Sequence, residues 1–170
     1  MFNKFNTIRP YTKGETCRTF PVYYPPQHQD KEPGMEYLMK PLPVFDNSNY
    51  RGSGKLKDKV AIITGGDSGI GRAVAVFFAK EGAKIVLVYY NEERDANYTK
   101  DYIENLGGEV LLIHGDLKNK DFSNFIVNET LNYYGKIDIL VNNAGVQYFA
   151  DNLTDISNEQ FDYTMKSNIY

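Results

Sequence analysis

The sequence predicts an α/β protein with a doubly wound parallel sheet, preceded by an irregular proline-rich N-terminal arm. A short β-branched run, residues 60–63, leads into a glycine-rich turn and then into a continuous apolar segment, residues 70–79. That order is typical of a buried parallel strand, a tight turn and a buried helix. Strands then alternate with helices of about 10 to 15 residues. This alternation requires parallel pairing through right-handed crossovers, with helices on both faces of the sheet.

The composition is that of a globular protein of about one domain. The chain has 170 residues, a net charge of −3 and a pI of about 5.4. This balance gives no reason to expect a nucleic-acid partner, and no basic patch is interleaved with aromatic residues. The longest apolar runs fall short of the roughly 18 residues that span a bilayer, and the N-terminus has no apolar signal-peptide core. We therefore predict a cytoplasmic protein with no membrane or nucleic-acid partner.

Cysteine and histidine are scarce in the chain. Cys17 is the only cysteine, which excludes an internal disulfide and a cysteine-rich zinc site. His28 lies in the arm without a partner pattern, and His114 is read as a strand residue because no second ligand stands at metal spacing around it. The sequence therefore predicts no metal site.

The two ends of the chain differ in composition. Residues 1–57 hold all seven prolines and have 9 lysines and arginines against 5 acidic residues, whereas residues 58–170 have 10 against 17 and no proline. We therefore divide the chain into an extended arm, 1–57, and an α/β domain, 58–170. A proline-rich basic segment can be a disordered tail, but apolar side chains favour an arm that lies across its own domain or a neighbouring subunit. Those side chains are Phe20, Val22, Tyr23, Tyr24, Tyr37, Leu38, Met39 and Phe45.

The elements of the domain follow from local signals. Strands are expected at residues 60–63, 84–90, 109–114 and 137–141, and helices at residues 70–81, 95–106 and 121–134. Gly82, Gly107 and Gly135 stand at helix C-cap positions. A last helix opens with a capping-box pattern, Ser157-x-x-Gln160, and its apolar residues are spaced four apart, which places them on one helical face. They are Phe161, Met165 and Ile169.

The glycine-rich turn predicts a binding site for nucleotide phosphates. Its spacing is Gly65-x-x-x-Gly69-x-Gly71, at the start of a helix. Backbone N–H groups and the helix dipole favour negative charge there, and a Cβ would block the approach of a pyrophosphate. A glycine-rich turn alone is more often an ordinary loop, but the strand before it and the helix after it favour a cofactor site. The residues expected to bind are Thr64, Gly65, Asp67, Ser68, Gly69, Ile70 and Gly71.

The turn resembles that of the short-chain dehydrogenase/reductase (SDR) family, which carries Thr-Gly-x-x-x-Gly-x-Gly at this point. Residues 64–71 match that pattern in full, and residues 142–145 match the family's Asn-Asn-Ala-Gly motif after the fourth strand. Residues 25–34 are similar to the N-terminal extension of a bacterial subgroup, the general-stress or glucose/ribitol dehydrogenase-like proteins. The resemblance implies a Rossmann-type fold, a nicotinamide cofactor and oxidoreductase activity.

The residues after the second strand leave the choice between NAD and NADP open. A dinucleotide site usually places an acidic side chain about 20 residues past the glycines, against the ribose hydroxyls. Here Tyr90 and Asn91 stand in that place, followed by two glutamates and Arg94. By resemblance, NADP-using relatives often carry Arg or Lys in the turn, where this chain has Asp67 and Ser68. An aspartate would repel the additional phosphate, so the sequence favours NAD, with Arg94 as the residue that argues for NADP.

Two further groups of residues follow the third and fourth strands. Asp116 and Leu117 can be an ordinary strand exit with a helix-capping carboxylate. By resemblance, Asp116 binds the adenine amino group and Leu117 packs against the ring. Asn143, Ala144 and Gly145 are more specific, because small residues there let the backbone run close to a flat ring. By resemblance they complete the cofactor site.

The resemblance supplies one catalytic residue of four. Asn168, which as bare sequence could be a polar residue on a helix, falls where the family has the asparagine that kinks the helix and holds a water in a proton relay. The catalytic serine and the Tyr-x-x-x-Lys pair of the family are not found in residues 1–170. We therefore expect the chain to be an N-terminal fragment with an incomplete sheet, and to be inactive alone.

The complete protein is expected to transfer a hydride between nicotinamide C4 and the carbonyl or secondary alcohol of a sugar, polyol or ketone. By resemblance it should form a homodimer or homotetramer. A non-catalytic dinucleotide-binding or sensor protein on the same fold is the alternative, and the sequence beyond Tyr170 would distinguish the two. A third interpretation, a proline-rich ligand for aromatic grooves, is weak because Pro25-Pro26 is not a P-x-x-P repeat.

Overall fold

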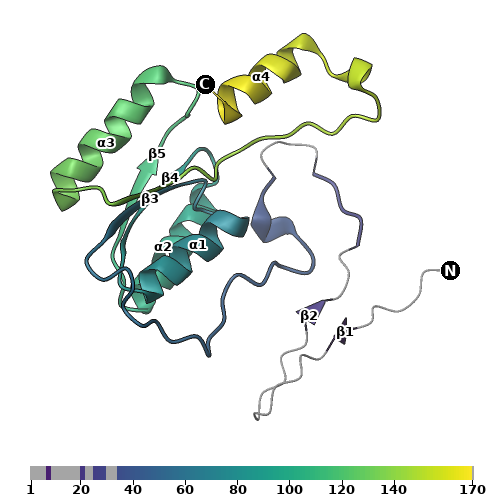
Figure 1. Ribbon diagram of the computed structural model, residues 1–170. Coiled ribbons are helices and arrows are strands. Elements are labelled where there is room, and N and C mark those ends of the chain that lie inside the picture. The colour runs from purple at the N-terminus through teal and green to yellow at the C-terminus, as the bar shows by residue number, and fades with distance from the viewer. Residues whose placement is uncertain (1–6, 9–19, 22–24, 30–33, 170) are drawn as a thin grey trace. The chain divides into compact units, whose positions relative to one another are not determined.

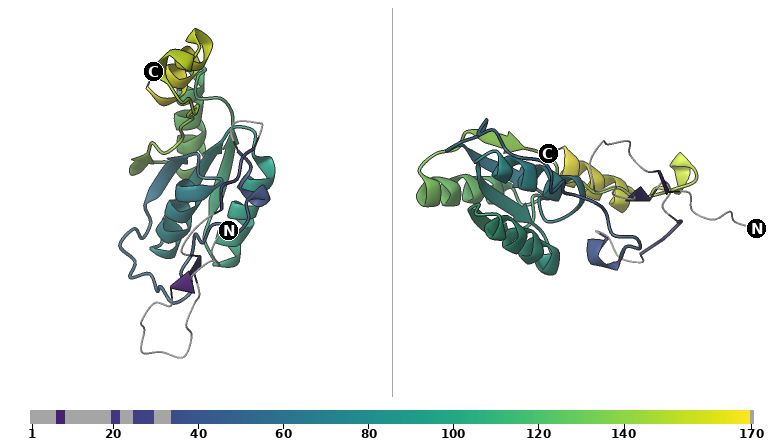
Figure 2. Two further views of the ribbon diagram at one scale, coloured as in Figure 1. Left: turned by 90° about the vertical axis from the view of Figure 1, so that its right-hand side faces the viewer. Right: turned by 90° about the horizontal axis from the view of Figure 1, so that it is seen from below.

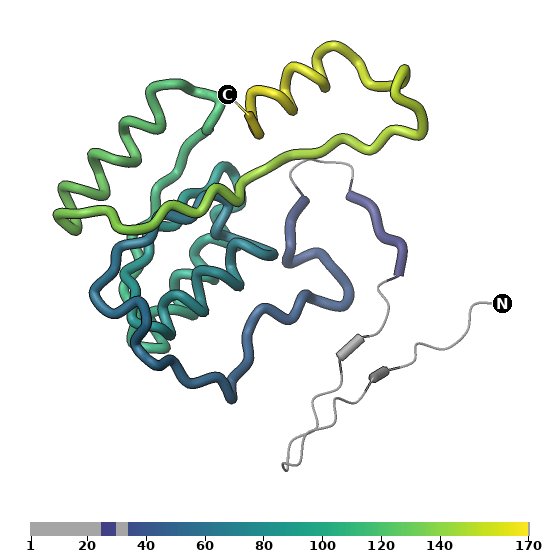
Figure 3. Tube along the Cα trace, in the orientation of Figure 1, coloured from purple at the N-terminus to yellow at the C-terminus, as the bar shows by residue number. Residues whose placement is uncertain are grey.

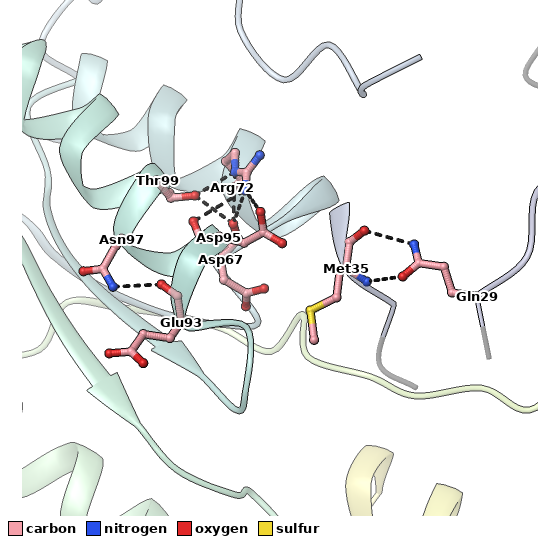
Figure 4. A network of polar contacts seen from close by, with 8 residues as sticks. All are labelled: Gln29, Met35, Asp67, Arg72, Glu93, Asp95, Asn97 and Thr99. Carbon is pink, nitrogen blue, oxygen red and sulfur yellow. Dashed lines mark hydrogen bonds and ion pairs between the residues drawn. The ribbon is translucent and has the colours of Figure 1, made fainter. Parts of the chain in front are cut away.

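The computed structural model describes residues 7–8, 20–21, 25–29 and 34–169, which fall into two compact units, residues 1–44 and residues 45–170. In the first unit, strands β1 (Thr7–Ile8) and β2 (Phe20–Pro21) pair antiparallel, and a short 3-10 helix spans Glu36–Leu38. The side-chain amide of Gln29 accepts from the N–H of Met35 at 2.8 Å and donates to its carbonyl at 3.0 Å (Figure 4). Cys17, Val22, Tyr23 and Tyr24 lie outside the described residues.

The second unit is a parallel sheet with helices on both faces (Figure 1, Figure 2). Its four strands lie in the order β5-β4-β3-β6, and every pair is parallel. The strands are β3 (Val60–Thr64), β4 (Lys84–Tyr89), β5 (Val110–His114) and β6 (Ile139–Val141). The helices are α1 (Gly69–Lys80), α2 (Glu93–Asn105), α3 (Lys120–Tyr134) and α4 (Asn158–Asn168). The predicted parallel α/β fold is confirmed.

Two apolar layers follow from the alternation of side chains along the central strands. Ala61 and Ile63 of β3 pack on the face that carries α1 and α2, whereas Val60 and Ile62 pack on the face that carries α3. The strand β4 is divided in the same way. Because both faces of these strands are buried, each reads as an unbroken apolar run in the sequence. The helices contribute Ala75, Val76, Ala96 and Ile103 to the first layer and Phe122 and Ile126 to the second.

Strand β6 lies at one edge of the sheet and pairs with β3 over three residues. It begins at Ile139, two residues later than the predicted start at residue 137. The carboxylate of Asp138 accepts from the N–H of Val60 at 2.9 Å and from the ammonium of Lys59 at 3.1 Å. These bonds hold the entry to β6 against the entry to β3. Leu140, in the middle of β6, remains 59% exposed.

Residues 45–57, which we call the strap, belong to the second unit although their composition resembles that of the arm. The strap is tied to the end of α1 by the carboxylate of Glu81. This carboxylate accepts from the hydroxyl of Tyr50 and, at 2.9 Å each, from the N–H groups of Ser53 and Lys55. The compact unit therefore starts at Phe45, ahead of the composition boundary at residue 58, because α1 supplies partners for these polar groups.

We expect Glu81→Gln to remove an acid-sensitive part of the stability. The bond from the Tyr50 hydroxyl, followed by the backbone N–H of Lys55, lowers the pKa of Glu81 from 4.5 to about 2. Because the folded pKa lies below the ordinary value, the stabilisation is present above pH 4.5 and is lost as the pH falls toward 2. Urea unfolding between pH 7 and about pH 2 measures it. The curve of the variant should be flatter in acid than that of the wild type. Glu109→Gln, at an exposed carboxylate, is the control, and an equal flattening there would contradict the prediction.

The part of the chain that the structure describes was searched for membrane-spanning helices and for clusters of metal-binding side chains. Within it, no helix combines the length and the apolar character needed to cross a membrane. Nor does any group of three or more histidine, cysteine, aspartate and glutamate side chains lie close enough together to hold a metal ion.

Candidate functional site

The glycine-rich turn joins the end of β3 to the first turn of α1, and its backbone requires glycine. Gly65 and Gly69 have φ values of +62° and +52°, in the left-handed region. A Cβ on Gly71 would lie 2.0 Å from the carbonyl oxygen of Gly65 and 2.6 Å from Nδ2 of Asn143. Ile70, beside it, is 78% exposed. The turn thus closes against backbone and leaves the N-terminus of α1 open, as a phosphate-binding turn requires.

Thr64 and Asn143 tie the end of β3 to the end of β6. The Thr64 hydroxyl accepts from the N–H groups of Asn143 and Ala144, each at 3.0 Å. The side-chain amide of Asn143 donates to the carbonyls of Thr64 and Gly65, at 3.0 and 2.9 Å. Their sequence motifs predict cofactor binding for each of these residues separately. The structure brings them together in one network that holds the turn and the segment after β6 in fixed positions.

Two carboxyl groups beside the turn are buried. Asp67, in the turn, and Glu92, just before α2, are each 5% exposed. Burial raises the pKa of both, and for Glu92 the charges of Asp67 and Asp95 raise it further. This side of the turn is therefore rich in carboxyl groups that resist further negative charge. Tyr90 and Asn91, at the end of β4, are exposed next to them.

Arg72 belongs to this region, although none of the sequence motifs points to it. It lies in α1 directly after Gly71 and is 3% exposed. Its guanidinium donates to the main-chain carbonyl of Asp67 from Nε at 3.0 Å and from Nη2 at 2.7 Å. It also donates to the Thr99 hydroxyl at 2.7 Å and pairs with Asp95 at 3.4 Å (Figure 4). Two features of the sequence could have indicated this role. Arg72 is the only charged residue in the apolar stretch 70–79, and the next helix carries Asp95 and Thr99 four residues apart, on one helical face.

Asp116 and Leu117 follow β5, as predicted, but their contacts are local. The carboxylate of Asp116 accepts from the N–H of Lys118 at 2.9 Å and pairs with its ammonium at 3.4 Å. That ammonium also lies 3.6 Å from the ring centroid of Tyr163 in α4 and 5.9 Å from that of Tyr90. The Cα trace shows the end of α4 beside the loop that joins β5 to α3 (Figure 3). Lys118 therefore links three of the segments that surround the site.

Asn168 ends α4 and faces the segment after β6. Its Oδ1 accepts from the N–H of Val146, and its Nδ2 donates to the carbonyl of Val146, both at 2.9 Å. A Cβ on Gly145 would lie 3.6 Å from that Oδ1. The structure therefore brings Asn168 to the Asn-Asn-Ala-Gly segment, while Ile169, expected on the same helix, follows it as the C-cap.

The sequence relatives agree with this geometry. The family model described as short chain dehydrogenase matches residues 59–170. General stress protein 39 of Bacillus subtilis is 49% identical over 151 residues, which cover 89% of this chain and 53% of that protein. Glucose and ribitol dehydrogenase of Daucus carota is 39% identical over 153 residues, covering 86% of this chain and 53% of that protein. The chain spans about half the length of the curated relatives it matches.

Solved structures give the same result. A short chain dehydrogenase from Burkholderia cenocepacia in complex with NADP superposes with a TM-score of 0.63 at 33% identity, over 67% of this chain and 46% of that one. The 3-ketoacyl-(acyl-carrier-protein) reductase from Brucella melitensis, complexed with NADH, gives 0.62 at 36% identity, over 67% and 45%. The predicted family is confirmed by the family model, and the predicted similarity to general-stress proteins by the Bacillus subtilis relative. This chain belongs to the short-chain dehydrogenase family.

Proposed function

We propose that the whole protein is a nicotinamide-dependent oxidoreductase that acts on the carbonyl or secondary alcohol of a sugar, polyol or ketone. The observation that carries the proposal is the turn at Gly71, where backbone packs so closely that a Cβ has no room. Such a turn at an open helix N-terminus fits a dinucleotide pyrophosphate. When bound, the nicotinamide supplies or accepts the hydride at C4. The substrate class is supported by the similarity to glucose and ribitol dehydrogenase of Daucus carota, which is 39% identical to this chain over 153 residues.

The residues of this chain have four roles in the proposal. The N–H groups of residues 65–71 bind the pyrophosphate, and the network of Thr64 and Asn143 keeps them aimed at it. The small residues Ala144 and Gly145 let the chain pass close to the cofactor rings. Asp116 and Leu117 bind the adenine. Asn168, through its bonds to Val146, orders the segment that follows Ala144 and Gly145.

We propose NAD rather than NADP as the preferred cofactor. The carboxyl groups of Asp67 and Glu92 lie beside the turn, and burial raises the pKa of each. Adding the 2′-phosphate of NADP near them would bring like charges together in a site of reduced solvent screening. We expect NADH to bind at least about tenfold more tightly than NADPH, which corresponds to about 1.4 kcal/mol. Fluorescence titration of the whole protein with both cofactors measures the ratio, and tighter binding of NADPH would contradict the preference.

Turnover by the whole protein tests the proposed function. The absorbance of reduced nicotinamide should change with time when the protein is mixed with a cofactor and a panel of sugars, polyols and simple ketones. Binding of the cofactor without turnover on any substrate would favour the non-catalytic sensor instead. Failure to bind either cofactor would refute the dinucleotide site itself.

Asn168→Ala is expected to lower kcat by at least about 100-fold, the lower end of what loss of a positioned proton-transfer group costs. The Kd for NADH should change much less than kcat, because Asn168 bonds Val146 and not the turn at Gly71 that binds the pyrophosphate. Stopped-flow and titration experiments on the whole protein separate the two constants. Asn152→Ala is the matched control, since the Asn152 side chain donates to the carboxylate of Asp155, three residues along the chain, and not to the segment after β6. An unchanged kcat in the Asn168 variant would remove it from the reaction.

A further inference from the structure

The guanidinium of Arg72 holds the carbonyl of Asp67, a backbone group of the phosphate-binding turn itself. Three donated bonds converge on that oxygen: two from Arg72, at 3.0 and 2.7 Å, and one from the Thr99 hydroxyl at 2.8 Å. All three residues are at most 5% exposed. In a region of low effective dielectric such bonds are strong and fix the orientation of the peptide they hold. The direction of the turn after Gly66 therefore depends on where Arg72 stands.

The position of Arg72 depends in turn on two aromatic rings. The guanidinium carbon lies 5.2 Å from the ring centroid of Phe45 and 5.0 Å from that of Tyr98, distances at which a cation is attracted by a ring face. Phe45 also packs edge-on against Tyr102, with centroids 5.0 Å apart. Tyr98 and Tyr102 lie on α2, whereas Phe45 is the first residue of the strap. One ring of the strap thus reaches the cation that holds the turn.

The residues of the strap that follow Phe45 are fixed to the domain by contacts of their own. Asp46 forms an ion pair with Lys80 at the end of α1 and accepts from the Tyr102 hydroxyl at 2.7 Å. At its other end the strap is tied to Glu81 through Tyr50. Besides Arg72, Phe45 is therefore placed by Lys80 and Tyr102, through Asp46, the next residue of the strap.

We propose that Phe45 is a positioning residue for the cofactor turn and acts through Arg72. The inference rests on the proposed dinucleotide site. Without the ring, the guanidinium regains rotamer freedom and access to water, and the Asp67 carbonyl loses a fixed partner. Binding the cofactor must then order the turn again, which weakens affinity because preorganisation is lost. A segment ahead of the family's motif thereby contributes to cofactor binding without touching the cofactor.

The test compares four forms of the whole protein: wild type, Phe45→Ala, Phe45→Leu and Phe45→Tyr. Fluorescence titration gives the Kd for NADH. Phe45→Ala should raise Kd about tenfold, which corresponds to about 1.4 kcal/mol and lies between the values for an exposed and a desolvated cation over a ring. Phe45→Leu, which keeps apolar volume but has no ring face, should raise it by several-fold, and Phe45→Tyr should stay close to the wild type. Phe45→Leu also serves if Phe45→Ala fails to fold.

Tyr50→Phe is the matched control, because it removes an anchor of the same strap that has no link to Arg72. It should lower the melting temperature and leave the Kd for NADH within about twofold of the wild type. Combining Phe45→Leu with Arg72→Lys should raise Kd by less than the product of the single effects, because both act through one contact. A purely structural role of Phe45 would give independent effects.

Different experimental results would refute the positioning role of Phe45 and the proposed function. If the wild type binds no dinucleotide, the proposed function is refuted. If the wild type binds NADH and Phe45→Leu binds equally well, the positioning role is refuted and the cofactor site stands. The positioning role is also refuted if Tyr50→Phe raises the Kd for NADH as much as Phe45→Leu does. Loosening the strap at any point would then be enough to weaken cofactor binding.

Discussion

Replacing Gly71 with alanine is expected to weaken dinucleotide binding by about 100-fold. A single methyl group at this position would lie 2.0 Å from the carbonyl oxygen of Gly65 and 2.6 Å from Nδ2 of Asn143. Neither group can move freely. The Gly65 carbonyl accepts from the Asn143 amide at 2.9 Å, and Asn143 is also bonded to Thr64. The turn must therefore open by about 1 Å, a displacement that typically costs about 100-fold in a preorganised site.

Fluorescence titration with NADH and turnover by the whole protein measure the effect of Gly71→Ala. The control is Gly107→Asn. Gly107 also stands in a turn, with φ of +84°, but a Cβ there meets nothing within 4 Å, and asparagine tolerates this backbone conformation. The control should cost little stability and leave the Kd for NADH unchanged. If Gly71→Ala binds NADH as the wild type does, the turn is not the cofactor site.

Replacing Arg72 with methionine is expected to cost about 3–5 kcal/mol of unfolding free energy, a large part of the roughly 5–15 kcal/mol of an ordinary domain. Methionine keeps the apolar length of the side chain but removes the charge. Asp95 and Asp67 would stay buried, at 3% and 5% exposure, without the cation that stands among them. Removing one partner of a buried pair is costlier than never having had the pair, because the remaining charge has no compensation.

The pH dependence gives the Arg72→Met prediction a second readout. Burial raises the pKa of Asp67 above its ordinary value of 3.8. A carboxyl group with a raised folded pKa stabilises the fold most below the unfolded pKa, and this contribution is lost as the pH rises through the folded pKa. Loss of Arg72 raises the folded pKa of Asp67 further, so the stability gap between variant and wild type should widen as the pH rises through the folded pKa that Asp67 has in the wild type.

Urea unfolding at several pH values between 4 and 8 follows that gap. Arg72→Lys is the conservative partner, because it keeps a positive charge but loses the planar fork that reaches Asp67 and Thr99 together. At neutral pH, Arg72→Lys should be more stable than Arg72→Met but less stable than the wild type. Its stability should depend on pH almost as that of the wild type does. A gap that is the same at every pH would show that the loss comes from packing and not from the uncompensated carboxyl groups.

Local sequence was sufficient to predict the order and type of the elements, because strand and helix signals are decided within a few residues. The apolar run at residues 60–63 is β3, and the predicted capping box of Ser157 and Gln160 is formed at the start of α4. Gly135 has φ of +77° and ends α3 where a C-cap glycine was expected. The family could also be recognised from the spacing of three glycines, since that spacing is imposed by the backbone itself.

The partners of the polar groups were decided only by the tertiary structure. Thr64 and Asn143 stand 79 residues apart, and they meet because β3 pairs with β6 in one particular register. Arg72 looks like an exception in an apolar helix until α2 brings Asp95 and Thr99 to it. Phe45, which composition assigns to the arm, packs on the domain for the same reason. Spacing along the chain determines local geometry, whereas the pairing of buried charges depends on which strands and helices become neighbours, and no local pattern contains that information.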